Sequence, residues 1–249
     1  PRGVAPLPTV ILYTDCGREV RGWLHLARFA SLGFAVVAPE IRRLPQAVRT
    51  SFEKAWKGEV SAGNLTAYYF NTNALDRAED SVVDCARRAP LFQLISDAYA
   101  TAHATQLLPF VDKGCLMTWG EGLGGALALD TAALLGAQCA GVMAQNPFFV
   151  DSEACVTDGF CSAQETPKNV RIADAMGLLD TASFAERITC PVLMACSLED
   201  RSSLPEGTCA AYNRIPAEQK RMAVYPRHAH ERINDFENLQ IDFLLTYSG

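Results

Sequence analysis

Three glycines stand close together in residues 116–129, LMTWGEGLGGALAL, where an apolar stretch gives way to a run of small residues. Two kinds of chemistry use such a junction. Gly120, Gly122 and Gly125 match the pattern G-x-G-x-x-G, in which glycines let the pyrophosphate of a dinucleotide approach the N-terminus of a helix. The same segment matches a nucleophile elbow, G-x-S-x-G, with Gly122 at the place of the serine.

The dinucleotide interpretation lacks its second requirement. It needs an acidic residue at the end of the next strand, roughly 20 residues beyond the glycines, to bind the ribose hydroxyls. Here the next strand ends in GVMAQNPFF, which contains no acid. The fingerprint also normally follows the first strand of its domain, whereas two predicted strands precede this one. A nucleotide site therefore stays a minor alternative, and no cofactor is expected.

The elbow interpretation predicts an acid and then a histidine, each just after a later strand. Asp200 follows the apolar stretch PVLMACS, and His228 and His230 follow RMAVY. A carboxylate there can accept the Nδ1–H of an imidazole and so fix its tautomer, while the other ring nitrogen faces the elbow across a gap wide enough for water. Glu121 lies beside the site and is a lesser candidate for a further carboxylate.

At these residues the chain resembles the acetyl xylan esterase and cephalosporin C deacetylase family of α/β-hydrolases. The resemblance covers about residues 8 to 247 and is sharpest in WGEGLGGALAL, CPVLMACSLEDRSSLPEGTCAAYNRI and VYPRHAHE. It implies that Asp200 is the acid of a catalytic triad, that His230 is the base, and that Gly122 replaces the serine. It also implies that the backbone amides of Cys16 and Leu123 bind the oxyanion.

Gly122 is the departure from this family that decides the function. Glycine adopts the strained backbone of the elbow without penalty, so it keeps the turn and removes the hydroxyl. The resemblance implies small acyl esters or acetylated sugars as ligands. We expect a protein that is weakly active or inactive. One alternative is an active esterase that uses water or another nucleophile, with the Cys16 thiol a minor option, and another is a ligand-binding or scaffold pseudoenzyme.

Alternating strand-like and helical stretches predict one α/β domain over residues 1–249, with a mostly parallel central sheet and helices on both faces. Two excursions, 45–71 and 147–188, interrupt the alternation and predict a lid-like insertion built of loops and short helices. The predicted strands are 9–13, 34–38, 114–119, 140–144, 191–196 and 221–225. The predicted helices are 19–32, 73–89, 91–108, 123–135, 205–214 and 234–247.

Composition narrows the class of protein further. A net charge of −6 argues against a nucleic-acid partner, and no apolar run approaches the ~18 residues of a membrane span. The nine cysteines favour a reduced, cytoplasmic protein, although Cys155 and Cys161 could pair in an exported one. No spacing of cysteine and histidine predicts a metal site. The resemblance to the esterase family also implies a possible homo-oligomer, since members of that family often form hexamers.

Overall fold

A computed structural model describes residues 5–15, 23–40, 50, 54, 81–150 and 167–248 of this chain. Several parts of the sequence-based interpretation fall outside these residues, including the beginnings of the predicted helices 19–32 and 73–89. The others are the backbone of Cys16, the cysteines at 155 and 161, nearly all of the excursion at 45–71, and residues 151–166 of the excursion at 147–188.

A six-stranded sheet forms the centre of the molecule, in the order β2-β1-β3-β4-β5-β6, and every neighbouring pair is parallel. The prediction of a parallel sheet is confirmed, and each strand overlaps its predicted range. The largest difference is at β3, which is longer than predicted at both ends. The strands are β1 (Leu7–Tyr13), β2 (Ala35–Val37), β3 (Val111–Glu121), β4 (Gly141–Gln145), β5 (Val192–Ser197) and β6 (Lys220–Tyr225).

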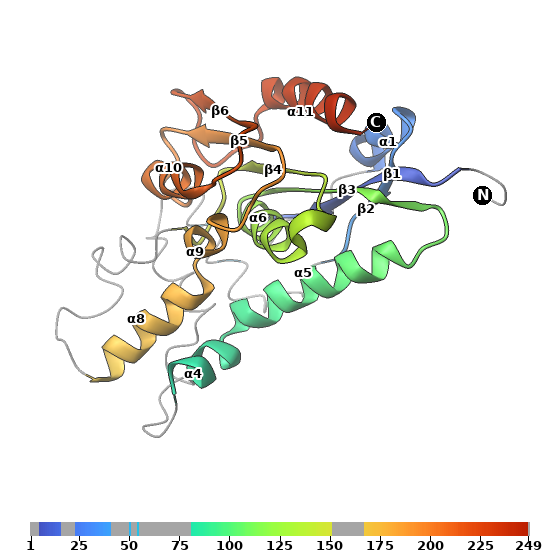
Figure 1. The fold of residues 1–249 in the computed structure, drawn as a ribbon. Coiled ribbons are helices and arrows are strands. Elements are labelled where there is room, and N and C mark those ends of the chain that lie inside the picture. The colour runs from blue at the N-terminus through green and yellow to red at the C-terminus, as the bar shows by residue number, and fades with distance from the viewer. Residues whose placement is uncertain are drawn as a thin grey trace.

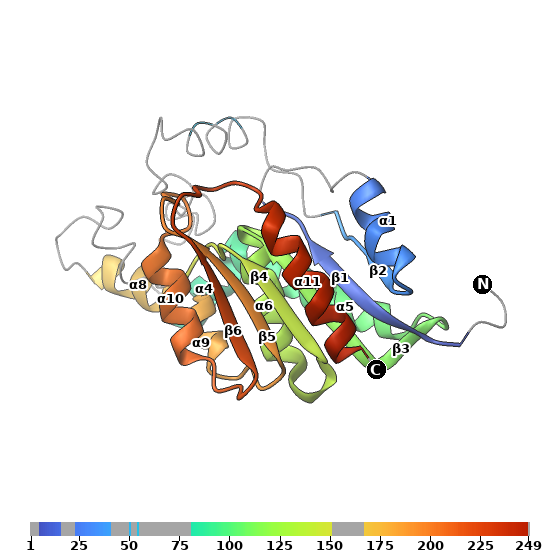
Figure 2. The same cartoon turned by 90° about the horizontal axis from the view of Figure 1, so that it is seen from above.

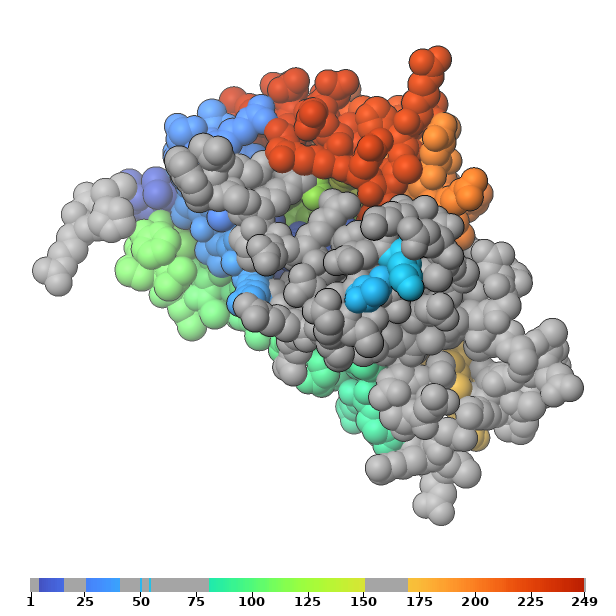
Figure 3. Space-filling view, turned by 180° about the vertical axis from the view of Figure 1, so that it is seen from behind, coloured from blue at the N-terminus to red at the C-terminus, as the bar shows by residue number. Residues whose placement is uncertain are grey.

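Helices cover both faces of this sheet (Figures 1 and 2). One face carries α1 (Trp23–Ser31) and α11 (Asn234–Tyr247). The other face carries α4 (Val82–Arg88), α5 (Pro90–Gln106), α6 (Leu123–Leu135), α8 (Pro167–Leu179), α9 (Thr181–Ala185) and α10 (Pro205–Arg214). A short 3₁₀ helix, η1 (Gly136–Gln138), leads from α6 to β4. Figure 3 shows the molecule from behind, where the C-terminal elements lie above α4 and α5.

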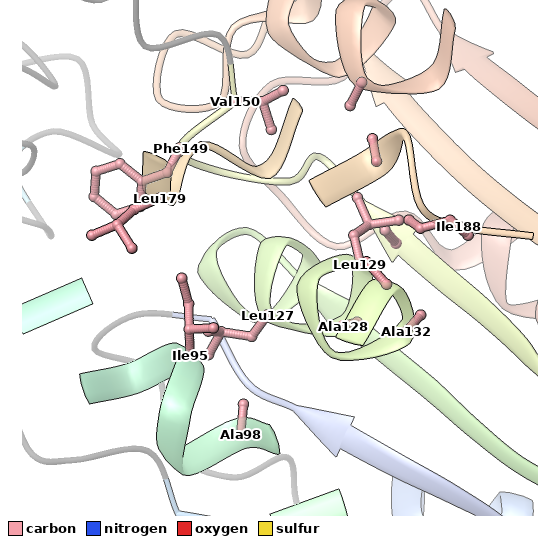
Figure 4. Packing of buried hydrophobic residues seen from close by; sticks show 14 of the residues in the cluster. Ile95, Ala98, Leu127, Ala128, Leu129, Ala132, Phe149, Val150, Leu179 and Ile188 are labelled. Atoms are coloured by element: carbon pink, nitrogen blue, oxygen red, sulfur yellow. The ribbon is translucent and has the colours of Figure 1, made fainter. Parts of the chain in front are cut away.

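The two faces have separate hydrophobic cores. Helix α6 is buried along nearly its whole length, and its residues Leu127, Leu129 and Ala132 pack between α5 and the segment around Ile188 (Figure 4). On the opposite face Trp119 packs edge-on against Phe29 of α1, with the ring centroids 6.0 Å apart. Trp119 is therefore a core residue. The small side chains of α6 let it lie close to the sheet, which places its N-terminus against the strand ends.

The excursion at 147–188 contains more helix than the sequence predicts. Its described part includes α8, a helix of 13 residues, followed by the short α9. The side chains of Ile172, Ala175 and Met176 are buried, so tertiary packing stabilises a helix whose sequence pattern is weak. Across the described residues, no helix is both long and apolar enough to cross a membrane.

Candidate active site

The chain turns sharply at Gly122, between the end of β3 and the first residue of α6. Gly122 has φ 53° and ψ −123°, a backbone region that side chains rarely adopt. Its N–H donates to the carbonyl of Gln145 at 2.9 Å, and its own carbonyl accepts from the N–H of Phe148 at 3.0 Å. The segment is thus a strand-to-helix elbow held against the end of β4, as the sequence predicts.

The neighbouring glycines are required by close packing inside the elbow. A Cβ at Gly124 would lie 2.1 Å from the carbonyl oxygen of Tyr13, and a Cβ at Gly120 would lie 2.0 Å from the carbonyl oxygen of Gly124. These contacts leave no room for a side chain at either position. At Gly125, the third glycine of the G-x-G-x-x-G pattern, a Cβ would lie 3.1 Å from the carbonyl oxygen of Gln145. Close packing of α6 against the ends of β1, β3 and β4 therefore accounts for the glycines on either side of Gly122.

Asp200 and His230 meet at the carboxyl ends of β5 and β6. Nδ1 of His230 lies 2.8 Å from Oδ2 of Asp200. The other carboxylate oxygen, Oδ1, accepts the backbone N–H groups of Ser202 and Ser203, both at 2.8 Å. The contact that the sequence predicts between these two residues is present. The rival histidine, His228, instead places its ring edge-on against Tyr225, with the centroids 5.5 Å apart.

The second ring nitrogen of His230 contacts a residue that sequence reasoning missed. Nε2 lies 2.9 Å from Oδ2 of Asp15, which follows the end of β1. Oδ1 of Asp15 accepts the backbone N–H of Leu123 at 3.0 Å. The predicted gap wide enough for water between His230 and Gly122 is therefore wrong. The carboxylate of Asp15 fills this space because β1 lies beside β3 and brings Asp15 next to the elbow.

Asp15 fits there only because Gly122 has no side chain. A Cβ built on Gly122 would lie 2.0 Å from Oδ1 of Asp15, 2.4 Å from its Cγ and 2.8 Å from its Oδ2. Real Cβ atoms essentially never approach another heavy atom within 3.0 Å. The carboxylate of Asp15 therefore occupies the volume that a serine side chain on the elbow would take.

The environment of His230 favours its charged form. Burial alone opposes the charge, but the carboxylates of Asp15 and Asp200 outweigh it and raise the pKa of His230 to about 10. At neutral pH both ring nitrogens then carry protons and donate to the two carboxylates. The N-terminus of α6 adds a partial positive charge beside Asp15 through the Leu123 N–H. His230 is thus an imidazolium held between two anions.

Residues at the end of β4 position the surrounding loops. The side-chain amide of Gln145 donates to the carbonyl of Glu231 at 2.8 Å, which fixes the loop that carries His230. Asn146 and Ser197 are joined by two hydrogen bonds, Ser197 N–H to Oδ1 at 2.8 Å and Nδ2–H to the Ser197 hydroxyl at 2.9 Å. Glu121 is buried at the end of β3. Among the described residues no cluster of histidine, cysteine and acidic side chains could hold a metal ion.

Comparison with known proteins gives one consistent result. The family model described as acetyl xylan esterase (AXE1) matches residues 1–247. Acetyl xylan esterase 1 from Thermoanaerobacterium sp. JW/SL YS485 is similar in structure, with a TM-score of 0.77 and 22% identity over 100% of this chain and 77% of that one. An acetyl xylan esterase from Paenibacillus sp. R4 has a TM-score of 0.74 and 20% identity over 99% and 77% of the two chains. Est1E from Butyrivibrio proteoclasticus has a TM-score of 0.61 and 12% identity over 98% and 90%. The fold is that of the α/β-hydrolases.

Proposed function

This chain belongs to the acetyl xylan esterase family, and we propose that it has lost the serine route of ester hydrolysis, so that it is weakly active or inactive on acetyl esters. The observation that carries the proposal is the position of the Asp15 carboxylate. It lies beside Gly122, against both the Leu123 amide and His230. The serine route needs a nucleophile, a base and an oxyanion site, and Asp15 affects all three.

The nucleophile is the first requirement. Gly122 carries no hydroxyl, and the volume for one is filled by the Asp15 carboxylate. An acyl-enzyme of the serine type therefore has no oxygen on which to form. Water cannot occupy that same volume while the Asp15 carboxylate fills it.

The base is the second requirement. A general base must be unprotonated at the working pH and must reach the proton that it removes. The pKa of His230 is raised to about 10, so at neutral pH the imidazole already holds its proton. That proton is directed at Asp15 rather than at a substrate.

The oxyanion site is the third requirement. In acyl transfer, backbone N–H groups receive the negative charge that develops on the carbonyl oxygen. The Leu123 N–H already donates to a full negative charge on Asp15. A substrate carbonyl would have to displace a buried carboxylate to reach this donor.

A set of four proteins tests the proposal with p-nitrophenyl acetate and an acetylated sugar. They are the wild type, Gly122→Ser, Asp15→Gly and the double variant Asp15→Gly/Gly122→Ser. We expect a large gain in kcat/KM only in the double variant, because only this protein has both the serine and the space for it. The gain should disappear when His230→Ala is added, since loss of a triad member costs roughly three or more orders of magnitude.

Two outcomes would contradict the proposal. One is efficient hydrolysis of acetyl esters by the wild type, because the Asp15 carboxylate would then not block the site. The other is strong activity in Gly122→Ser alone, which would mean that serine and the Asp15 carboxylate coexist. Circular dichroism of each variant separates loss of activity from loss of folding.

A further inference from the structure

The two carboxylate oxygens of Asp15 have different partners. Their positions match those of the two oxygens of an ester bound in a hydrolytic site. Oδ1 accepts the amide N–H of Leu123 at 3.0 Å, as the carbonyl oxygen of an ester would. Oδ2 faces Nε2 of His230 at 2.9 Å, as the ester oxygen next to an acid–base group would. Asp200 holds the other nitrogen of the same ring at 2.8 Å. The side chain of Asp15 is thus already placed as the acyl part of an ester in a hydrolytic site.

We propose that Asp15 is a carboxylate nucleophile that attacks small alkyl electrophiles, in particular epoxides, and that the site hydrolyses the aspartyl ester so formed. This activity goes beyond the ester hydrolysis discussed above and does not need the serine route. A carboxylate suits a strained ring better than an ester carbonyl. Attack on an ester would give a reactive anhydride, whereas attack on an epoxide gives a stable ester and releases the ring strain.

In the first step Oδ2 of Asp15 forms a bond to a ring carbon, and the bond between that carbon and the ring oxygen breaks. The ring oxygen leaves on the side opposite Oδ2 and takes a proton from water, and the hydroxide so formed takes the Nε2 proton of the His230 imidazolium. The products are a hydroxyalkyl ester of Asp15 and a neutral His230. The distance of 2.9 Å between Oδ2 and Nε2 places the base that the second step needs beside the ester that the first step forms.

In the second step the neutral His230 acts as a base. Esterification has removed the negative charge of Asp15, which is one of the two carboxylates that raise the pKa of His230, so the ring holds its proton less tightly. His230 takes a proton from water, and the hydroxide adds to Cγ of Asp15. The negative charge develops on Oδ1, where the Leu123 N–H already donates. Collapse breaks the Cγ–Oδ2 bond, and the leaving alkoxide takes the proton from His230. The carboxylic acid left on Asp15 then gives its own proton to His230, which restores the starting carboxylate and imidazolium.

The sum of the two steps is the addition of one water to an epoxide to give a diol, and no oxidant or cofactor is consumed. The oxygen of the water ends in the carboxylate of Asp15, while the former Oδ2 leaves in the diol. Gly122 has a role in this scheme, because any side chain there would overlap the nucleophile. The low exposure of Asp15 and His230 restricts the electrophile to small molecules.

The test is a single-turnover reaction of the intact protein, in excess over 1,2-epoxybutane, in water enriched in oxygen-18. Trypsin then releases residues 3–18, a peptide in which Asp15 is the only acidic residue. We expect this peptide to gain the mass of one oxygen exchange while the diol carries unlabelled oxygen. With His230→Gln, the peptide should instead gain the mass of the whole epoxide, because the ester forms but is not hydrolysed.

Controls separate the aspartyl ester from other reactions. Hydroxylamine cleaves an ester of Asp15 but not a thioether of Cys16, which lies in the same peptide. Asp15→Asn should reduce diol formation to the uncatalysed rate, whereas Asp242→Asn, an exposed acid on α11, should leave it unchanged. Diol that forms without label in the peptide, or wild-type protein that gives neither label nor diol, would overturn the proposal. Assays with p-nitrophenyl acetate in parallel report separately on the loss of the serine route.

Discussion

Any side chain added at residue 122 would overlap the carboxylate of Asp15. Gly122→Ala should therefore cause an unusually large loss of stability. The new Cβ would lie 2.0 Å from Oδ1 of Asp15, so the buried carboxylate must move away. It would then lose its hydrogen bonds to Leu123 and His230, each of which involves a charged group and is worth about 1.5–3 kcal/mol. The positive φ of residue 122 adds about 1–2 kcal/mol for any side chain.

We therefore expect Gly122→Ala to lower the free energy of unfolding by about 3–5 kcal/mol, from the backbone penalty and the loss of at least one of these bonds. The chain supplies a matched control at Gly136. This residue has φ 55° and ψ −124°, nearly the same backbone as Gly122, and a Cβ added to it would meet no heavy atom within 4 Å. Gly136→Ala should thus show the backbone penalty alone, about 1–2 kcal/mol.

Urea denaturation of both variants, with and without Asp15→Gly, measures the difference. Removing the carboxylate should reduce the cost of Gly122→Ala, which gives a coupling energy of about 1–3 kcal/mol, and should not change the cost of Gly136→Ala. Equal costs for the two alanine variants, or purely additive effects at 15 and 122, would refute the argument that the Asp15 carboxylate occupies the elbow volume.

Three further predictions concern other parts of the structure. His230 binds its proton more tightly in the folded protein, where its pKa is about 10, than in the unfolded chain, where it is 6.5. The stability that this group contributes is therefore full below pH 6.5 and is lost as the pH rises to about 10. Urea midpoints of the wild type should fall across this range, and those of His230→Gln should change less. Gly124→Ala should destabilise the protein by about 3 kcal/mol, because the new Cβ would collide with backbone atoms. Gly177→Ala in α8 meets no heavy atom within 4 Å and should stabilise the protein by up to about 1 kcal/mol. Thermal melts measure both, and an unchanged stability of Gly124→Ala would contradict the close packing of the elbow. Asn146→Ala should lower the free energy of unfolding by about 2–3 kcal/mol, because both of its hydrogen bonds to Ser197 are buried. No change in the same melts would show that these bonds do not stabilise the contact between the ends of β4 and β5.

The elements and two of the polar residues could be predicted because the sequence carries local signals for them. Glycines between an apolar strand and a small-residue helix mark the elbow at Gly122. Asp200 and His230 each follow an apolar strand, and parallel strands bring their carboxyl ends to one edge of the sheet. The contact between them follows from strand order alone. Helix α8 was underestimated because its sequence is only weakly amphipathic and its stability comes from packing.

Asp15 could not be assigned in the same way. It also follows an apolar strand, but an aspartate there is usually a turn former, and nothing local separates the two roles. Its place in the site depends on the pairing of β1 with β3, which lie more than 90 residues apart in sequence. It depends equally on the missing side chain of Gly122. The available signal was the coincidence of an acid on one strand end with a glycine on the neighbouring one.

The shared volume of Asp15 and Gly122 constrains the order in which these two residues could have been acquired. A chain with serine at 122 has no room for the Asp15 carboxylate in this position, so if an ancestor carried that serine, the change to glycine came before the aspartate took this position or together with it. Once Asp15 was in place, a return to serine at 122 alone became a destabilising step. With Asp15 in this position, a single change to serine at 122 is therefore disfavoured, and a chain that gains the serine must also move or replace the aspartate on the neighbouring strand.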